Sequence, residues 1–376
     1  MKILYLTDGI NAVFQSQVLG LMNEVAKNES ISKVVLCIGL RDLSQIPKFK
    51  LTHPKIELLF FKSYPMYPFF NILTKRSIIK TFKNITDIKN YIIHVRIEFL
   101  ASLIYDELKK DSANAPKFLV DIRGALIEEI KEYGKYNVLL KTLKLFMYKK
   151  KITRLLNQAP TINVVSKALK DYIKSKYSVQ HNRISIIPTI AGNNFSYKPK
   201  EGNLVRKSLG ISDNERLYVF SSGSSQTWQN TDELINVAET QNIKILLLTK
   251  DNIKHPNIIS KYVDYEAVPN YLAAADVGVI IRENSIVNYV SSPIKFCEYV
   301  SSGLPVQCVG DIKTISDFKS TCNSKEMVQI SDEFLFDTSI SFTSIQRKEL
   351  SAQATKTFGV KAISLRYIDE YKNLNS

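Results

Sequence analysis

Short runs of apolar residues alternate along the chain with longer stretches in which apolar residues recur at helical spacing. Because nearly all-apolar strands separated by helices indicate a parallel sheet covered on both faces, the pattern predicts a doubly wound α/β fold. The predicted strands are residues 2–6, 33–38, 56–61, 92–95, 118–121, 161–165, 184–187, 217–221, 244–249, 277–281 and 306–309. The predicted helices include residues 15–26, 100–110, 130–157, 168–176, 231–239, 268–274 and 293–302.

The alternation is interrupted by a polar stretch over residues 188–216. An interruption rich in polar residues and turn formers is typical of a domain boundary. We therefore expect an N-terminal Rossmann-like domain over residues 1–190 and a second one over residues 191–359. The last stretch, residues 360–376, has the apolar stripe of an amphipathic helix and is expected to pack back on the first domain.

The composition is that of an ordinary globular protein, with 45% hydrophobic and 23% charged residues, which excludes disordered and fibrous classes. No run of 18 apolar residues occurs, so no membrane span is expected, and the apolar start of the chain is too short for a signal peptide. The four cysteines form no CxxC pair, and the four histidines form no HExxH motif. We therefore expect neither disulfides nor a bound metal, and a reducing cytoplasm fits this chain.

The formal net charge of +15 predicts an anionic partner. The charge is concentrated between residues 131 and 185, where 13 lysines and arginines stand against 2 acidic residues. This block is either a solvated helical face or a surface that rests on anionic lipid, since Lys149-Lys-Lys-Ile-Thr-Arg follows the apolar stretch Leu145-Phe-Met-Tyr. Nucleic acid is not an expected partner, because the chain has no recognised nucleic-acid motif and no basic platform interleaved with aromatic residues.

The most informative stretch covers residues 274–306. After the buried strand 277–281, Ser292 is a good N-cap residue and Pro293 suits the first position of a helix. The helix then ends at Gly303, because glycine is typical of the position just after a helix. The stretch thus predicts a helix whose first backbone N–H groups are open to a ligand at the carboxyl end of a strand.

Three residues of this helix point to a ligand with a phosphate and a ribose. The backbone N–H groups of Ile294 and Lys295 lie at the positive end of the helix dipole, and the ammonium group of Lys295 adds a full charge. Glu298, on the same helix face, can accept two hydroxyl hydrogen bonds from a ribose. The alternative is a capped surface helix with an ion pair between Lys295 and Glu298.

The same stretch resembles the C-terminal signature of GT-B fold glycosyltransferases, and in particular glycosyltransferase family 4. In that family an Ala-Ala-Asp strand entry, a Pro-x-Lys-x-x-Glu-Tyr helix and a Gly-x-Pro-Val strand follow one another, as they do here from Ala274 onward. Four further segments are similar to the family: Val120-Asp-Ile-Arg-Gly, Val164-Val-Ser-Lys-Ala-Leu, Arg206-Lys-Ser-Leu-Gly-Ile and Ser221-Ser-Gly-Ser-Ser-Gln-Thr-Trp. The resemblance covers about residues 90–310.

The resemblance implies two Rossmann-like domains that face a cleft, and transfer of a sugar from a nucleotide-diphosphate sugar to a glycan or lipid-linked acceptor. It also implies retention of the anomeric configuration, no metal and no cofactor besides the donor substrate, and the chain has no Asp-x-Asp motif. The expected setting is bacterial surface polysaccharide synthesis in the cytoplasm, with peripheral contact at the inner membrane face through residues 131–185. The competing hypothesis is a non-catalytic GT-B partner or scaffold protein.

The resemblance assigns the nucleotide-sugar site to the second domain. Glu298 matches the glutamate that binds the donor ribose, and the helix start at residues 292–295 matches the one that faces the diphosphate. Contacts to the base are expected from the backbone near residues 263–266. The implied donor-binding residues are Glu298, Ser292, Ile294, Gly223, Ser224, Val263 and Glu266.

One departure from the family concerns the transferred sugar. Family members often carry another glutamate eight residues before the one that matches Glu298, and Val290 stands there in this chain. We expect Glu283, in the loop after the strand 277–281, to contact the sugar instead. The alternative is a loop glutamate paired with a nearby lysine.

A second departure concerns the diphosphate. The family usually places an arginine and then a lysine after the glycine that matches Gly223, and this chain has no basic residue there. Loss of two cations from a diphosphate site is costly unless others replace them. Lys295, Arg282 and the helix-start amides are expected to take over this role.

In the acceptor-side domain, Asp121-Ile-Arg-Gly occupies a strand end where the family commonly has a histidine. We expect Arg123 to bond the sugar or phosphate and Asp121 to orient it, and a buried structural Asp–Arg pair is an equal alternative. His94 ends another strand at a similar level and is expected to be a core histidine. The catalytic candidates are thus Lys295, Arg282, Glu283, Arg123 and Asp121.

Overall fold

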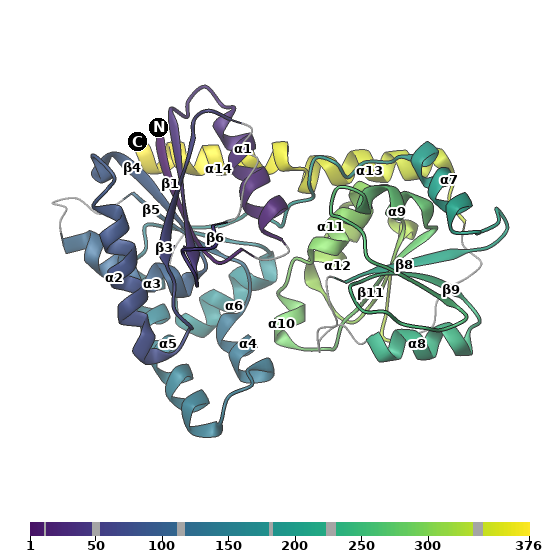
Figure 1. Cartoon of the computed structure of the whole chain (residues 1–376), viewed down its shortest axis with the longest axis horizontal. Helices are drawn as coiled ribbons and strands as arrows, with labels where there is room; N and C mark the ends of the chain where they lie inside the picture. The colour runs from purple at the N-terminus through teal and green to yellow at the C-terminus, as the bar shows by residue number, and fades with distance from the viewer. Residues whose placement is uncertain (11–12, 47–52, 111–116, 180–182, 223–230, 334–340) are drawn as a thin grey trace. The chain divides into compact units, whose positions relative to one another are not determined.

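The structure is a computed structural model that describes residues 1–10, 13–46, 53–110, 117–179, 183–222, 231–333 and 341–376. These residues form two compact units (Figure 1). Unit 1 comprises residues 1–188 and 363–376, and unit 2 comprises residues 189–362. Each unit is built around its own parallel sheet.

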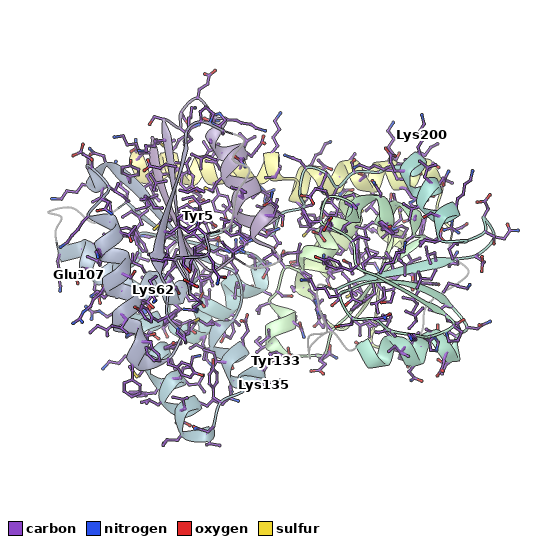
Figure 2. The ribbon with its side chains drawn as sticks, in the orientation of Figure 1. Tyr5, Lys62, Glu107, Tyr133, Lys135 and Lys200 are labelled. Atoms are coloured by element: carbon purple, nitrogen blue, oxygen red, sulfur yellow. The ribbon has the colours of Figure 1, made fainter. Side chains whose placement is uncertain are left out.

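The sheet of unit 1 has seven parallel strands in the order β3-β2-β1-β4-β5-β6-β7. Its strands are β1 (Lys2–Asp8), β2 (Lys33–Leu40), β3 (Ile56–Lys62), β4 (Tyr91–Arg96), β5 (Phe118–Ile122), β6 (Thr161–Val164) and β7 (Ile184–Ile186). The central strands are buried along nearly their whole length, and neither Leu4 nor Tyr5 of β1 has exposed surface. Figure 2 labels Tyr5 among the side chains of this unit. Burial on both faces explains why these strands read as almost continuous apolar runs.

Helices surround this sheet. They are η1 (Gln15–Gly20), α1 (Leu21–Ala26), η2 (Pro68–Phe70), α2 (Asn71–Phe82), η3 (Ile88–Asn90), α3 (Glu98–Lys110), α4 (Leu126–Tyr133), α5 (Val138–Gln158) and α6 (Lys167–Tyr177). The last helix of the chain, α14 (Val360–Asn375), also belongs to unit 1 from Ile363 onward. Its apolar stripe of Ile363, Tyr367 and Tyr371 is buried, and Tyr371 contacts His94 of β4.

Unit 2 contains a six-stranded parallel sheet in the order β10-β9-β8-β11-β12-β13. Its strands are β8 (Leu217–Ser221), β9 (Lys244–Leu248), β10 (Ile258–Lys261), β11 (Val277–Ile281), β12 (Val306–Val309) and β13 (Val328–Ser331). Its helices are α7 (Pro199–Ser208), α8 (Thr231–Thr240), α9 (Val268–Ala274), α10 (Ile286–Tyr289), α11 (Ile294–Ser301), α12 (Lys313–Thr321), η5 (Lys325–Met327) and α13 (Ser344–Phe358). The core of this unit includes Phe296, Tyr299 and Val300 of α11.

The doubly wound α/β fold class expected from the sequence is confirmed. The strands predicted at residues 217–221, 277–281 and 306–309 have the observed bounds. Two strands were missed, β10 and β13, which lie at the two edges of the sheet of unit 2. Each has only four residues, with the sequences IISK and VQIS, so neither presents the apolar run by which a buried strand is recognised.

Candidate functional site

The strand order of unit 2 creates a topological switch point. From β8 the chain proceeds through β9 to β10 on one side of the sheet, whereas β11, β12 and β13 follow one another on the other side. The neighbouring strands β8 and β11 are therefore connected in opposite directions. In open α/β sheets, ligands bind outside the carboxyl ends of the strands at such a point.

Two of the candidate residues, Arg282 and Glu283, lie at this edge of the sheet. The last residue of β8 is Ser221, and Ser222 follows it. After β11, the chain continues directly with Arg282 and Glu283. Because the sheet is parallel, the carboxyl ends of these strands lie side by side. Arg282 is partly buried and Glu283 is exposed. Within the described residues no ion pair reaches the Glu283 carboxylate, so the lysine pairing considered from the sequence is not observed.

The start of α11 differs from the prediction by one residue. The N-cap is Pro293, and the helix begins at Ile294 with no side-chain cap. The predicted capping role of Ser292 is therefore wrong. Its hydroxyl accepts a hydrogen bond from the backbone N–H of Thr189 at 3.3 Å, and its carbonyl accepts one from the Thr189 hydroxyl at 2.8 Å. Thr189, which is distant in sequence, thus bonds the Ser292 hydroxyl oxygen that an N-cap residue would use to accept a hydrogen bond from the helix.

Lys295 and Glu298 form a close ion pair on α11. The Lys295 Nζ donates to Glu298 Oε2 at 2.9 Å. The Glu298 side chain is only 1% exposed and that of Lys295 is 30% exposed, so this is not the surface pair considered from the sequence. A carboxylate that is taken out of water is stable only with a charged or hydrogen-bonding partner, and Lys295 supplies it here.

Tyr299, the next residue on α11, connects this helix to the end of β8. Its hydroxyl accepts a hydrogen bond from the backbone N–H of Ser221 at 2.8 Å. Burial raises the pKa of Tyr299, so the phenol stays neutral. The hydrogen bond holds the carboxyl end of β8 and the helix at a fixed separation. Arg282 is close enough for its charge to oppose the rise in the pKa of the same phenol.

Two of the four remaining donor-binding candidates of unit 2, Val263 and Glu266, are among the described residues. Val263 follows the edge strand β10, is partly buried and packs against the core, whereas Glu266 is exposed. Gly223 and Ser224 lie outside the described residues. Sequence reasoning missed Lys250, which follows β9 at the same edge of the sheet and places its ammonium group 5.3 Å from the ring centre of Tyr262. The signal available was a basic residue directly after a predicted strand.

The unit 1 candidates form a buried polar cluster at the carboxyl ends of β4 and β5. Asp121 contacts His94 Nε2 at 3.6 Å and Arg123 Nη1 at 3.4 Å. The Arg123 side chain is 13% exposed, and it also donates to the hydroxyl of Tyr367 at 3.4 Å. His94 is fully buried, and its Nδ1 lies 2.7 Å from the hydroxyl of Tyr371.

Electrostatics fix the charge states in this cluster. Burial alone would raise the pKa of Asp121, but the charge of Arg123 and the nearby imidazole of His94 lower it below its usual value. Burial lowers the pKa of His94, so its imidazole is neutral. Asp121 is thus an ionised carboxylate that orients Arg123, and the structure contains the buried Asp–Arg pair considered as an alternative from the sequence.

The described residues hold no group of three or more histidine, cysteine or acidic side chains arranged to bind a metal ion. None of the helices in the described part of the chain combines the length and the apolar character needed to cross a bilayer.

Comparison with solved structures identifies the architecture. Sucrose-phosphate synthase from Thermosynechococcus elongatus superposes with a TM-score of 0.72 at 13% identity, covering 100% of this chain and 99% of that one. HepE from Anabaena, solved with UDP, gives a TM-score of 0.66 at 13% identity, covering 99% of this chain and 100% of that one. The chain has the GT-B fold.

A third structure agrees with this assignment. WaaG, a glycosyltransferase involved in lipopolysaccharide biosynthesis, matches with a TM-score of 0.61 at 13% identity, covering 100% of this chain and 99% of that one. At these identities the likeness establishes the GT-B fold and not the substrates. No protein-family model and no curated protein sequence matches the chain.

Proposed function

We propose that this chain is a glycosyltransferase that takes its sugar from a nucleotide-diphosphate sugar bound by unit 2. The observation that carries the proposal is the buried Glu298 carboxylate, paired with Lys295 on the helix α11 that begins at the switch-point edge of the sheet. HepE, which has the same fold, was solved with UDP and with UDP-glucose, and this supports a nucleotide sugar as the donor.

In this proposal α11 binds the ribose and the diphosphate. Glu298 accepts hydrogen bonds from the ribose hydroxyls, and the N–H groups of Ile294 and Lys295 face the diphosphate. Lys295 is tethered by one ion pair and is 30% exposed, so its ammonium group can turn toward a phosphate. Gly223 and Ser224 would complete the phosphate contacts, and the backbone near Val263 and Glu266 would contact the base.

The chemistry follows from where charge develops. Transfer breaks the anomeric C–O bond, passes through an oxocarbenium-like transition state and releases a nucleoside diphosphate, which gains negative charge. Lys295, Arg282 and the backbone N–H groups at the start of α11 stabilise that leaving group. Glu283 is proposed to contact the transferred sugar, and Arg123, oriented by Asp121, is proposed to bond a sugar or a phosphate. We propose retention of configuration without a metal ion, as the family 4 resemblance implies.

The acceptor and the location form a further part of the proposal. The resemblance to family 4 implies a glycan or lipid-linked acceptor in surface polysaccharide synthesis, and the shared fold with WaaG supports this setting. We propose a cytoplasmic protein that contacts the inner membrane face through the basic region 131–185. In that region α5 presents Val138 and Leu139 with 82% and 83% of their surface exposed, beside many lysines.

Calorimetric titration with UDP, GDP and ADP tests the donor site. We expect at least one of these nucleotides to bind, and Glu298→Gln to weaken it tenfold or more, because a charge-assisted hydrogen bond contributes about 1.5–3 kcal/mol. Glu349→Gln removes an exposed carboxylate from the same unit and serves as the control. Absence of binding by all three nucleotides, or unchanged affinity in the folded Glu298→Gln variant, would contradict the proposal.

One observation favours the second candidate, a non-catalytic GT-B partner. Val290, which stands where family 4 often has the sugar-contacting glutamate, has no exposed surface, so its apolar side chain packs in the interior where the family has a carboxylate. Release of sugar from a bound nucleotide sugar, followed with and without candidate acceptors, separates the two hypotheses. A protein that binds the nucleotide and never turns over the donor would fit the partner hypothesis.

A further inference from the structure

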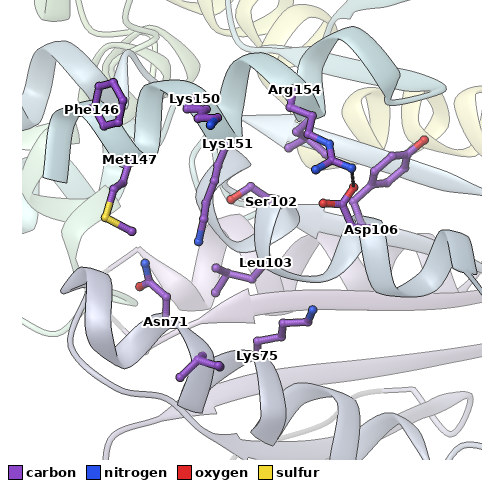
Figure 3. A pocket seen from close by; sticks show the side chains of 13 residues that line it. Asn71, Lys75, Ser102, Leu103, Asp106, Phe146, Met147, Lys150, Lys151 and Arg154 are labelled. Atoms are coloured by element: carbon purple, nitrogen blue, oxygen red, sulfur yellow. Dashed lines mark ion pairs between the residues drawn. The ribbon is translucent and has the colours of Figure 1, made fainter. Parts of the chain in front are cut away.

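A pocket of about 610 Å³ lies within unit 1 among the helices α2, α3 and α5 (Figure 3). Its volume is in the range of small-molecule sites, which span roughly 300–1,000 Å³. The lining combines two kinds of side chain, cations and apolar groups. The charged lining residues are Lys75, Lys150, Lys151, Arg154 and Asp106.

The positive charge of the pocket is only partly neutralised. Arg154 pairs with Asp106 at 3.2 Å, and Lys75 pairs at 2.8 Å with Glu107, which lies outside the lining. Among the described residues no carboxylate lies within ion-pair distance of Lys150 or Lys151. The pocket therefore carries two positive charges that have no acidic partner in the described part of the chain.

Lys151 is the cation that reaches into the pocket. Figure 3 shows its side chain extending from α5 toward α2, which carries Asn71 and Lys75. It is partly buried, and burial together with the charge of Lys75 lowers its pKa. Two neighbouring ammonium groups in a partly dehydrated space are stabilised by an anion placed between them.

The apolar part of the lining continues onto the open surface. Ile72 and Phe146 line the pocket and are 54% and 69% exposed. Immediately before α2, Phe69 and Phe70 of η2 are 76% and 41% exposed. Large apolar side chains gathered beside unpaired cations are typical of surfaces that touch both the headgroups and the acyl chains of a membrane.

We propose that this pocket binds the phosphate headgroup of an acidic phospholipid while Phe146 and Ile72 contact its acyl chains. A soluble anion would account for the lysines but not for the exposed apolar rim, whereas a phospholipid matches both. The proposal refines the membrane contact proposed above into one defined site, with Lys151 as its central ligand. It stands on residues of unit 1 and is independent of the nucleotide site in unit 2.

The experiment uses soluble short-chain lipids, so that one site is measured without a bilayer. Dihexanoyl phosphatidylglycerol, below its micelle concentration, is titrated calorimetrically into the full chain, with dihexanoyl phosphatidylcholine as the neutral comparison. We expect saturable one-to-one binding of the acidic lipid alone. Lys151→Gln should weaken it at least tenfold, and Lys150→Gln, an exposed second lining residue, should weaken it measurably.

Lys149→Gln is the matched control, because Lys149 lies on the same helix, is exposed and is not part of the lining. We expect it to stay within twofold of the unaltered chain. An equal loss of affinity for the acidic lipid in Lys149→Gln and Lys151→Gln would indicate a diffuse basic surface and would overturn the proposal of a defined site. No binding of the acidic lipid, equal binding of the neutral lipid, or equally tight binding of inorganic phosphate would also overturn it. Nucleotide titrations of the same samples report separately on the glycosyltransferase proposal.

Discussion

Gly278→Ala tests how closely the candidate donor site is packed. A Cβ atom at Gly278, in β11, would lie 2.5 Å from Cδ2 and 2.8 Å from Cγ of Tyr299, whereas carbon atoms in contact are normally about 3.5–4.0 Å apart. Tyr299 has no exposed surface, and its hydroxyl holds the Ser221 N–H. The ring therefore has to move by about an ångström inside a filled core, and it carries its hydrogen bond with it.

The expected cost follows from these two effects. Overpacking a well-filled core costs about 1–3 kcal/mol, and loss of the Tyr299–Ser221 hydrogen bond adds about 1 kcal/mol. We therefore expect Gly278→Ala to lower the free energy of unfolding by about 2–4 kcal/mol, measured by urea denaturation. Tyr299→Leu removes the ring that clashes, so the double variant should be more stable than the sum of the two single effects predicts.

The double-variant cycle decides whether the clash is the cause. A coupling free energy of about 1 kcal/mol or more between the two substitutions is expected for residues in direct contact. If the two effects simply add, or if Gly278→Ala is as stable as the unaltered chain, the packing argument for Tyr299 is wrong.

Three other outcomes are expected. Because burial lowers the pKa of His94, the unfolded chain binds a proton in acid that the folded chain does not. The free energy of unfolding should therefore fall as the pH drops below about 6.5. Urea titrations at several pH values should show a flatter dependence for His94→Phe. Burial raises the pKa of Glu98 to about 8, so the folded chain keeps a proton that the unfolded one loses above its ordinary pKa of 4.5. Stability should therefore decrease between these two pH values, and Glu98→Gln should abolish that decrease. All four cysteines are buried, and a thiol reagent should label them only after urea is added; rapid labelling of the native protein would refute this.

The fold was readable from the sequence because its central strands are short apolar runs between amphipathic helices. Residues 277–281 and 306–309 illustrate this, since both are buried on each face. The edge strands β10 and β13 were not predicted, because an edge strand tolerates polar residues such as Ser260 and Gln329, which interrupt the apolar run.

The site was less predictable, because tertiary contacts decide it. Sequence spacing placed Lys295 and Glu298 on one helix face, but only packing determines that the carboxylate is buried and the ammonium group is not. Ser292 fits the local rule for an N-cap, and its bonds to Thr189, more than one hundred residues earlier, override that rule. Lys250 lies near the site only because β9 adjoins β8 in the sheet.

The return of α14 to unit 1 has a consequence for biosynthesis. Unit 1 is assembled from two separate segments, residues 1–188 and 363–376, and its buried cluster around His94 includes Tyr367 and Tyr371 of the second segment. A ribosome delivers the second segment after all of unit 2, so unit 1 stays open along that helix until residues 363–376 have been made. Unit 2 is continuous in sequence and is complete earlier, so the second unit of the chain is the first that can mature.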